Sequence, residues 1–371
     1  MNIPPAKAVF EKKDRQEILS RIDECLSSGM LTQGKYVQEF EKRWAEYVGV
    51  KHAIGVNSGS SAIEISMRIL GIEGKEVLVP TNTFAATAEG VSRAGGRVRF
   101  IDTDPSTFSI SLEDLQTRRT PDTVGIIIVH IGGIVTPKIQ AIRRWCEEKN
   151  LWLFEDCAHA HGSEYDNKQA GTFGIAGGFS FFATKVMTTG EGGMIVTNDD
   201  KLTEYARLFR NHGKPEPWVS YHTHLGSNWR MSELNAILGL TQLKRLDEFI
   251  AWRSDIARLY TELLEDVPEL TPILPSSRSS WYKYIVLLPK EVNRSVLKQL
   301  MKEYKIGLSG EVYEVPLHKQ PIFKDITEGN FPMADDICSR HICLPIYYGM
   351  KQDEVHYVIN VLKKILLKTK L

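Results

Sequence analysis

Short apolar runs alternate with helix-like stretches between His52 and Thr197, and this alternation limits the fold more than any other feature of the chain. The runs are HAIGV, EVLVP, RVRFID, VGIIIVH, LWLFED, GGFSFF and GMIVT. Amphipathic stretches such as SSAIEISMRIL and IQAIRRWCEEKN separate most of them. Strands that are apolar throughout need cover on both faces, which helices provide when they connect parallel strands. The pattern therefore predicts an α/β fold with a mostly parallel, seven-stranded sheet between helices.

A second, smaller domain is predicted after the alternating region. A long helical stretch that starts near Met231 predicts a connector. A strand-like run, SWYKYIVLLP, and two helical runs, VNRSVLKQLMKEY and VHYVINVLKKILL, follow it in that order. This order is typical of a small α+β domain, and 371 residues are enough for two domains. We therefore expect a large domain at residues 1–248, N-terminal helices included, and a small C-terminal domain at residues 249–371.

The composition excludes several classes of function. Lys+Arg and Asp+Glu both number 46, and no run of like charge stands out, so nothing indicates binding to nucleic acid or to an anionic membrane. The five cysteines include no Cys-x-x-Cys pair, which favours reduced, buried thiols over zinc or disulfides. The N-terminus lacks the apolar core of a signal peptide, and no apolar run approaches the roughly 20 residues of a membrane span. We expect a cytoplasmic protein without a metal site.

A turn of small residues follows the run HAIGV, and a helical stretch begins in it. The residues of the turn are Asn57, Ser58, Gly59, Ser60 and Ser61. Open parallel sheets bind ligands at the carboxyl ends of their strands, and the exposed N–H groups of a helix N-terminus bind anions. The turn is therefore a candidate phosphate site, although it lacks the Gly-Lys-Ser/Thr of a P-loop. The alternative is an ordinary helix start that Ser60 caps.

Two ionisable residues follow buried strands further along the chain. Asp156 ends the run LWLFED, where a carboxylate is costly to bury without a cationic partner, although a helix-capping role is the alternative. Lys185 lies between GGFSFF and GMIVT, among small residues and glycines. A lysine held away from water has a lowered pKa and becomes nucleophilic. We therefore interpret Lys185 as a Schiff-base lysine rather than an exposed one.

These features together match the needs of pyridoxal phosphate. The cofactor needs a lysine for its aldehyde, an acid for its ring nitrogen and an anion pocket for its phosphate. Ser180, five residues before Lys185, is placed to offer a hydroxyl to that phosphate. Phe84, which follows EVLVP in the stretch PTNTFAAT, is a candidate to stack on the ring, and plain core packing is the alternative.

Segments along nearly the whole chain match, in order, those of one enzyme family. The most specific are the Ser-x-x-x-x-Lys element with its Gly-Glu-Gly-Gly tail and the Gly-x-Asn-x-Arg-Met-Ser element. Other matching segments are LTQGKYVQEFEKRWAEYVGVKHAIGVNSGSSAIEI, VLVPTNTFAATAEGVSRAGGRVRFIDTD, FEDCAHAHGSEY, VPLHKQPIF and LPIYYGM. In these segments the sequence resembles the DegT/DnrJ/EryC1/StrS family of sugar aminotransferases, which have the fold-type-I pyridoxal-phosphate architecture.

The resemblance implies a role for each candidate near the cofactor. Lys185 would hold the cofactor as a Schiff base and then move the proton, and Asp156 would pair with the pyridinium. Phe84 would stack on the ring. His159 lies where the family usually has Gln, which leaves the partner of the ring hydroxyl open. The residues that would bind the phosphate are Gly59, Ser60 and Ser180.

The resemblance also implies a homodimer with shared active sites. Asn228 corresponds to the family asparagine that reaches the phosphate of the neighbouring subunit, and Arg230 follows in the same loop. Tyr313 and His318 lie where family members meet the sugar, although a structural role for His318 is an equal alternative. In VHIGGIVTPKIQAI, Gly133 precedes Ile-Val-Thr where the family usually has Gly-x-Pro and an acidic-Met pair, so the substrate is left open.

The implied reaction is a two-step transamination. An amino acid, most simply L-glutamate, gives its amine to the cofactor, which then aminates a nucleotide-linked sugar at a 3- or 4-keto group, and PTNTF favours position 3. An inosose or a keto-octulosonate is the alternative acceptor. Dehydratases of the family carry His where Lys185 stands, which argues against that reaction. The intact set of Asp156, Ser180 and Lys185 argues against a binding protein that has lost catalysis.

Overall fold

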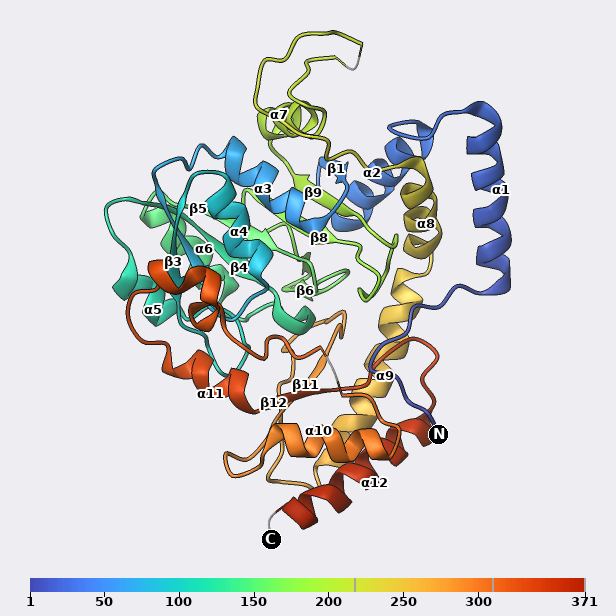
Figure 1. Ribbon diagram of the computed structural model, residues 1–371, viewed down its shortest axis with the longest axis vertical. Helices are drawn as coiled ribbons and strands as arrows, with labels where there is room; N and C mark the ends of the chain where they lie inside the picture. Colours follow the sequence, from blue (N-terminus) through green and yellow to red (C-terminus); the bar gives the residue numbers. More distant parts are fainter. Residues whose placement is uncertain (217, 309, 370–371) are drawn as a thin grey trace.

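A seven-stranded sheet is the centre of the computed structural model, which describes residues 1–216, 218–308 and 310–369 (Figure 1). The strand order is β1-β9-β8-β5-β4-β2-β3. β9 runs antiparallel to both neighbours, and the pairs from β8 to β3 are parallel, so the predicted α/β fold is confirmed. The strands are β1 (His52–Val56), β2 (Glu76–Pro80), β3 (Arg97–Ile101), β4 (Thr123–Val129), β5 (Trp152–Asp156), β8 (Ala176–Ser180) and β9 (Gly193–Thr197).

Helices cover both faces of this sheet because its strands are apolar on both faces. In β4, Ile126 and Ile128 contribute to one hydrophobic core, whereas Ile127 and Val129 contribute to another. The helices that pack on the first core are α2 (Lys35–Val48), α6 (Ile139–Glu148) and α8 (Glu233–Leu243). Those that pack on the second core are α3 (Gly59–Ile69), α4 (Ala85–Arg93) and α7 (Asp200–Arg210).

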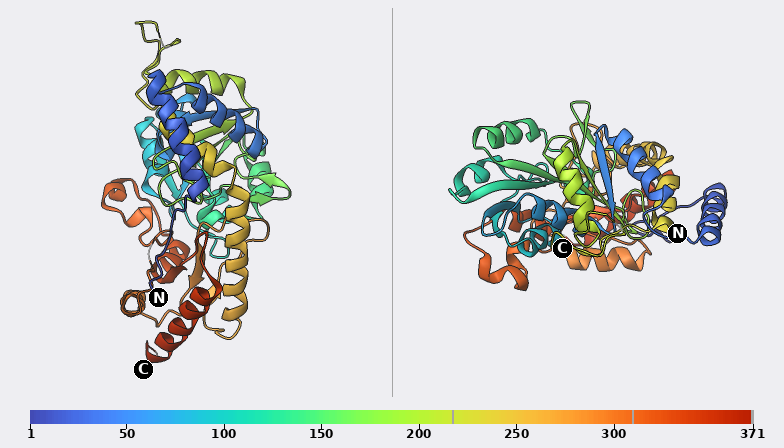
Figure 2. Two further views of the ribbon diagram at one scale, coloured as in Figure 1. Left: turned by 90° about the vertical axis from the view of Figure 1, so that its right-hand side faces the viewer. Right: turned by 90° about the horizontal axis from the view of Figure 1, so that it is seen from above.

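The C-terminal part of the chain forms a second lobe around a three-stranded antiparallel sheet, and the N-terminus lies beside this lobe (Figure 2). Its strands are β10 (Thr271–Pro272), β11 (Tyr284–Leu287) and β12 (His341–Leu344). Its helices are α10 (Arg294–Glu303), α11 (Pro332–Arg340) and α12 (Gln352–Thr369). The predicted strand and both predicted helices correspond to β11, α10 and α12. β10, β12 and α11 were not predicted, and α11 packs on the large-lobe core.

The predicted connector consists of two helices. α8 ends at Leu243, and α9 (Leu246–Leu264) follows after a short break. Arg245, at the break, forms ion pairs with acidic residues at the start of α1 (Lys12–Ser28). The first turns of α9 pack on the large-lobe core and its later turns pack in the small lobe. The break therefore turns the chain from one core toward the other.

The predicted boundary between residues 1–248 and 249–371 falls inside α9. Because that helix contributes to both lobes, the boundary stays a prediction. Residue 217 of the first range and residues 309, 370 and 371 of the second lie outside the described residues.

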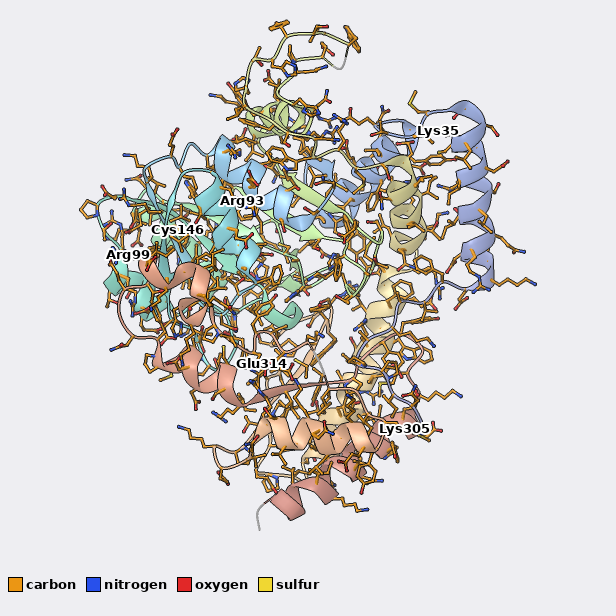
Figure 3. The ribbon with its side chains drawn as sticks, viewed as in Figure 1. Lys35, Arg93, Arg99, Cys146, Lys305 and Glu314 are labelled. Atoms are coloured by element: carbon orange, nitrogen blue, oxygen red, sulfur yellow. The ribbon has the colours of Figure 1, made fainter. Side chains whose placement is uncertain are left out.

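The N-terminal helices expected in the large domain are α1 and α2, and each ends just before a glycine. Gly29 follows α1 with a φ of 71° and Gly49 follows α2 with a φ of 79°, a backbone conformation that favours glycine. Lys35, the first residue of α2, forms an ion pair with Glu24 of α1 near the turn that joins the two helices (Figure 3).

All five cysteines are buried and free, as the sequence indicates. Cys146, for example, lies on α6 within the large lobe (Figure 3). Within the described residues, no helix combines the length and the apolar character that crossing a membrane requires.

Candidate active site

A cavity of about 380 Å³ lies at the carboxyl ends of the parallel strands, between the two lobes. Strands β5 and β8 end at it, and helix α3 begins at it. Residues of the small lobe form the opposite wall. The sequence-predicted residues that line this cavity are Gly59, Ser60, Phe84, Asp156, His159, Ser180, Lys185 and Tyr313.

The N-terminus of α3 forms one end of the cavity. Ser58 is the capping residue, because its Oγ accepts a hydrogen bond from the Ser61 N–H at 3.1 Å. The alternative in which Ser60 caps the helix is therefore wrong. A Cβ on Gly59 would lie 2.7 Å from the Cβ of Ser180, so only glycine lets the helix start pack this closely on β8. The free N–H groups of a first helical turn and two serine hydroxyls are suited to an anion.

Asp156 lies at the end of β5 and is buried. Its Oδ2 accepts a hydrogen bond from Thr87 Oγ1 at 2.8 Å, and its Oδ1 accepts one from the Ala158 N–H at 3.1 Å. Burial raises the pKa of this carboxyl above its ordinary value, and these hydrogen bonds only partly oppose the rise. A carboxyl in this state gains from a cationic partner placed in the cavity, and a protonated ring nitrogen is such a partner.

Lys185 lies in the loop between β8 and β9, on the same cavity as Asp156. Its Nζ is 4.7 Å from the centroid of the Tyr282 ring. Burial lowers the pKa of the Lys185 amine, although Tyr282 and Asp156 oppose part of this effect. The neutral amine is therefore easier to form than on an exposed lysine, and it is the form that attacks an aldehyde.

His159 is held between aromatic rings in a defined protonation state. Its Nδ1 accepts a hydrogen bond from the Gly132 N–H at 3.3 Å, so the proton of the neutral ring lies on Nε2 and is donated to the Tyr313 hydroxyl at 3.2 Å. Burial, with the charge of Lys185 next in size, lowers the pKa of His159 well below its ordinary value. The ring also stacks on Tyr282 with centroids 4.2 Å apart.

Phe84 is not part of the core. It precedes α4, and 59% of its surface is exposed, although it is a large apolar residue. Its ring lies 6.0 Å from the ring of Tyr313, across the cavity mouth. An exposed aromatic face on a cavity wall is suited to stacking on a flat ligand. The alternative of plain core packing does not fit this exposure.

Three predicted residues do not line the cavity of the described chain. Asn228 is exposed in the segment between α7 and α8, and Arg230 donates a hydrogen bond to Asn211 Oδ1 at 2.8 Å. Both ring nitrogens of His318 have partners, Thr81 Oγ1 at 2.7 Å and Asp335 Oδ1 at 2.9 Å. This geometry favours the structural alternative for His318.

Tyr282 and its neighbour Lys283 were not singled out from the sequence. Burial by itself would raise the pKa of the Tyr282 hydroxyl, but the charges of Lys185 and Lys283 outweigh it and the net pKa is lowered. One feature of the sequence could have identified them: in SWYKYIVLLP, a lysine lies between two tyrosines at the start of an otherwise apolar strand.

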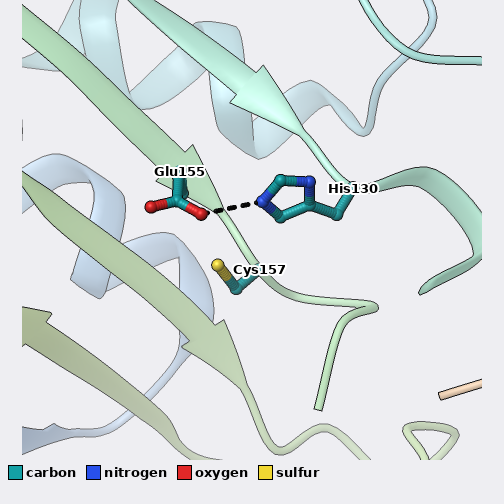
Figure 4. A group of neighbouring side chains, drawn as sticks. All are labelled: His130, Glu155 and Cys157. Atoms are coloured by element: carbon teal, nitrogen blue, oxygen red, sulfur yellow. Dashed lines mark hydrogen bonds and ion pairs between the residues drawn. The ribbon is translucent and has the colours of Figure 1, made fainter. Parts of the chain in front are cut away.

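A buried trio of His130, Glu155 and Cys157 lies beside the active site (Figure 4). His130 Nε2 is 2.9 Å from Glu155 Oε2. Three backbone N–H groups, of residues 171, 173 and 174, also donate to the Glu155 carboxylate at 2.6 to 2.8 Å. These N–H groups occupy the oxygens of the Glu155 carboxylate, so the carboxylate anchors the segment that leads into β8 rather than holding a cation.

Comparisons with known proteins identify the family of this chain. A model of the DegT/DnrJ/EryC1/StrS aminotransferase family matches residues 12–363. The chain is 35% identical to the spore coat polysaccharide biosynthesis protein SpsC of Bacillus subtilis, with 94% of each chain covered. It is 33% identical to GDP-perosamine synthase of Vibrio cholerae, over 92% of this chain and 94% of the other.

Two solved structures share the whole fold. PseC of Helicobacter pylori, an aminotransferase involved in the biosynthesis of pseudoaminic acid, superposes with a TM-score of 0.92 at 28% identity over 98% of this chain and 99% of that one. The GDP-4-keto-6-deoxy-D-mannose-3-dehydratase of E. coli, with bound hydrated PLP, gives a TM-score of 0.91 at 26% identity over the same shares. The fold therefore does not by itself separate amination from dehydration.

Proposed function

This chain belongs to the DegT/DnrJ/EryC1/StrS aminotransferase family, whose enzymes use pyridoxal phosphate, and we propose that it transfers the amine of L-glutamate to a nucleotide-linked keto sugar. The observation that carries the proposal is the presence, on one cavity, of a buried carboxyl and a lysine whose pKa is lowered. Lys185 also argues against dehydration, because dehydratases of this family have histidine at that position.

When bound, pyridoxal phosphate supplies an aldehyde that takes up an amine and a ring that accepts electrons. Lys185 would attach the cofactor covalently and, when free, would act as the base, because burial favours its neutral amine. The Asp156 carboxylate at the end of β5 would balance a protonated ring nitrogen. Thr87 and the Ala158 N–H hold that carboxylate in a fixed orientation.

The other lining residues bind and orient the cofactor. The start of α3, with Gly59, Ser60 and Ser180, would bind the phosphate through N–H and hydroxyl groups. Phe84 would stack on the ring. His159 stays neutral and donates to Tyr313, so the tyrosine hydroxyl proton is free for the ring hydroxyl or for the sugar.

The relatives and the sequence both support a nucleotide-linked keto sugar as the acceptor. GDP-perosamine synthase is named for a nucleotide-linked sugar, which supports an acceptor of that kind. The segment PTNTF, which carries Phe84, favours a 3-keto over a 4-keto sugar. Tyr313, a small-lobe residue on the cavity wall, is available to contact the acceptor. An inosose or a keto-octulosonate remains the alternative acceptor.

The test is a visible absorption spectrum of the purified protein with pyridoxal phosphate, before and after L-glutamate. The band of the lysine-bound cofactor is expected to bleach with glutamate and to return when a matching nucleotide-linked 3-keto sugar is added. Amino sugar appears in the same reaction, measured by mass spectrometry. A protein that binds no cofactor would refute the proposal. Return of the band with an inosose or a keto-octulosonate, and not with nucleotide sugars, would select the alternative acceptor.

We also propose that the enzyme is a homodimer with shared active sites. Asn228 lies outside the cavity of its own chain, in the long segment between α7 and α8 that extends beyond the body of the large lobe (Figure 1). Large apolar side chains on this segment are exposed: Trp218 by 79% and Leu225 by 84%. Apolar residues with this exposure support a protein contact there.

Mixing two inactive variants is expected to restore activity if sites are shared. Asn228→Asp places a negative charge beside the phosphate of the partner's site, and Lys185→Ala removes the attachment point in its own site. In a hybrid dimer, one of the two sites contains both native residues. About half of the dimers in an equal, co-refolded mixture are hybrids, so about a quarter of all sites should be active. Light scattering checks the dimer mass. Mixtures no more active than the separate variants would contradict shared sites.

A further inference from the structure

Lys283 is a buried cation beside the active site that the reaction described above does not use. It directly precedes β11, and only 8% of its surface is exposed. Its Nζ lies 5.0 Å from the centroid of the Tyr282 ring, and a Cβ on Gly310 would come within 2.5 Å of it. Tyr282 and Gly310 both line the active-site cavity. The ammonium group therefore stands at the cavity wall, where the lack of a side chain at residue 310 leaves room for it.

The charges around the cavity leave this ammonium without an anion. The described part of the cavity wall has three carboxylates, and none forms an ion pair with Lys283. Glu311 is paired with Lys298 at 2.6 Å, Asp156 faces the cofactor position, and Glu191 is exposed to solvent. Among the residues that the structure describes, no carboxylate lies within ion-pair distance of Lys283. Burying an ammonium group without an anionic partner is costly, and the cost is recovered when a ligand brings an anion.

The distance between the ammonium groups of Lys283 and Lys185 limits which ligand anion can bind to Lys283. Both ammonium groups lie within 5 Å of the centroid of the same tyrosine ring, so they are at most about 10 Å apart. In an amino acid a carboxylate is only a few bonds from the amine that is transferred. In a nucleotide-linked sugar the diphosphate is on the far side of the hexose from a 3- or 4-keto group. A carboxylate of the donor is therefore within reach of Lys283 while its amine is at Lys185, with no hexose between the two groups, and we favour it over the diphosphate.

We propose that Lys283 binds a carboxylate of the amino-acid donor and so selects the donor. The inference rests on the proposed transamination and adds the recognition group for its first substrate. Lys283 acts by charge, so a neutral side chain of similar length removes the interaction and leaves the packing against Tyr282 in place.

The test compares Lys283→Met with Lys290→Met, a control in which an exposed lysine on the small lobe is changed. Glutarate, a dicarboxylate without an amine, is titrated into the cofactor-loaded enzyme in a calorimeter. Lys283→Met is expected to raise the Kd of glutarate and the KM of L-glutamate by about tenfold or more, with the KM of the keto sugar unchanged. Lys290→Met should change none of these values. Lys283→Gln serves as the neutral variant if Lys283→Met does not fold.

The outcomes separate this proposal from the proposed function. If wild-type enzyme does not respond to any amino acid, the transaminase assignment fails. If wild-type enzyme responds and the neutral variants bind glutarate as tightly as it does, Lys283 is not the carboxylate site. If the variants lose affinity for a nucleoside diphosphate but not for glutarate, the anion is the diphosphate and the donor assignment is overturned.

Discussion

A Lys185→Ala variant is expected to transfer amine at least about ten-thousandfold more slowly than the parent, because general-base catalysis alone contributes up to about 10⁴. The residue also provides the covalent attachment of the cofactor, and alanine leaves neither an amine nor a base in its place. The cavity keeps its remaining contacts, so pyridoxal phosphate should still bind through the phosphate site at α3. The change therefore removes chemistry and leaves most of the binding.

Single-turnover kinetics with cofactor-loaded enzyme and L-glutamate measure this loss. The visible band of the lysine-linked cofactor should be missing before any amine is added, and a small primary amine such as methylamine should partly restore proton transfer. Lys201→Ala, which changes an exposed lysine on α7, is the control and should behave as the parent. A Lys185→Ala enzyme within about tenfold of the parent rate would contradict the assignment of Lys185.

The sheet could be predicted because each of its strands is a short apolar run that is recognisable from its own residues. A run such as VGIIIVH is apolar at every position, and the structure places alternate residues of β4 in two different cores. The break between α8 and α9 could not be predicted from the sequence, because the residues on both sides of it have helical periodicity. The two helices separate because α8 packs on one core and α9 continues into another, and those cores are assembled from segments that are distant in the sequence. β12 and α11 were missed for the same reason: their partners, β11 and the large-lobe core, are far away in sequence.

The site was predictable where the chain itself brings residues to the sheet edge. Asp156 and Ser180 are the last residues of β5 and β8, so strand prediction was enough to place them together. Lys283 and Tyr282 come from the other lobe, and only the packing between lobes brings them to Lys185. The cap of α3 is Ser58, two positions before the serine considered from the sequence. Several serines in the turn have a side chain that can cap a helix, and the backbone conformation decides which of them does.

An Asp156→Asn variant is expected to lose turnover by about a hundred- to a thousandfold, the usual cost of removing one electrostatic group from an active site. Asparagine keeps the shape of the side chain: its Oδ1 can accept from the Ala158 N–H, and its Nδ2 can donate to Thr87 Oγ1, whose own proton then goes to Thr83 Oγ1. The change therefore removes the charge and keeps both contacts. Without that charge the ring nitrogen of the cofactor is less readily protonated, and the ring accepts electrons less well. A cofactor whose ring nitrogen is methylated carries its charge permanently and should recover part of the rate.

The same variant should make the cofactor-free protein no less stable. Because burial raises the pKa of Asp156 in the folded chain, the folded state binds this proton more tightly than the unfolded chain does. The stability of the cofactor-free parent therefore falls as pH rises through the window between the ordinary and the raised pKa, and the penalty persists at neutral pH. Asparagine has no such penalty, so its Tm at neutral pH should equal or exceed that of the parent.

Adding pyridoxal phosphate should make the Tm of the parent higher than that of Asp156→Asn. A ligand stabilises a protein more the more tightly it binds, and the variant binds the cofactor less tightly because it has lost the ion pair with the ring nitrogen. Scanning calorimetry of both proteins, with and without pyridoxal phosphate, provides the comparison. Thr87→Val keeps the carboxylate but removes one hydrogen bond, so its Tm with cofactor bound should lie between those of the parent and Asp156→Asn. A fall in Tm of the cofactor-free Asp156→Asn protein would mean that the carboxylate is a structural anchor of β5, and its role toward the ring nitrogen would have to be abandoned.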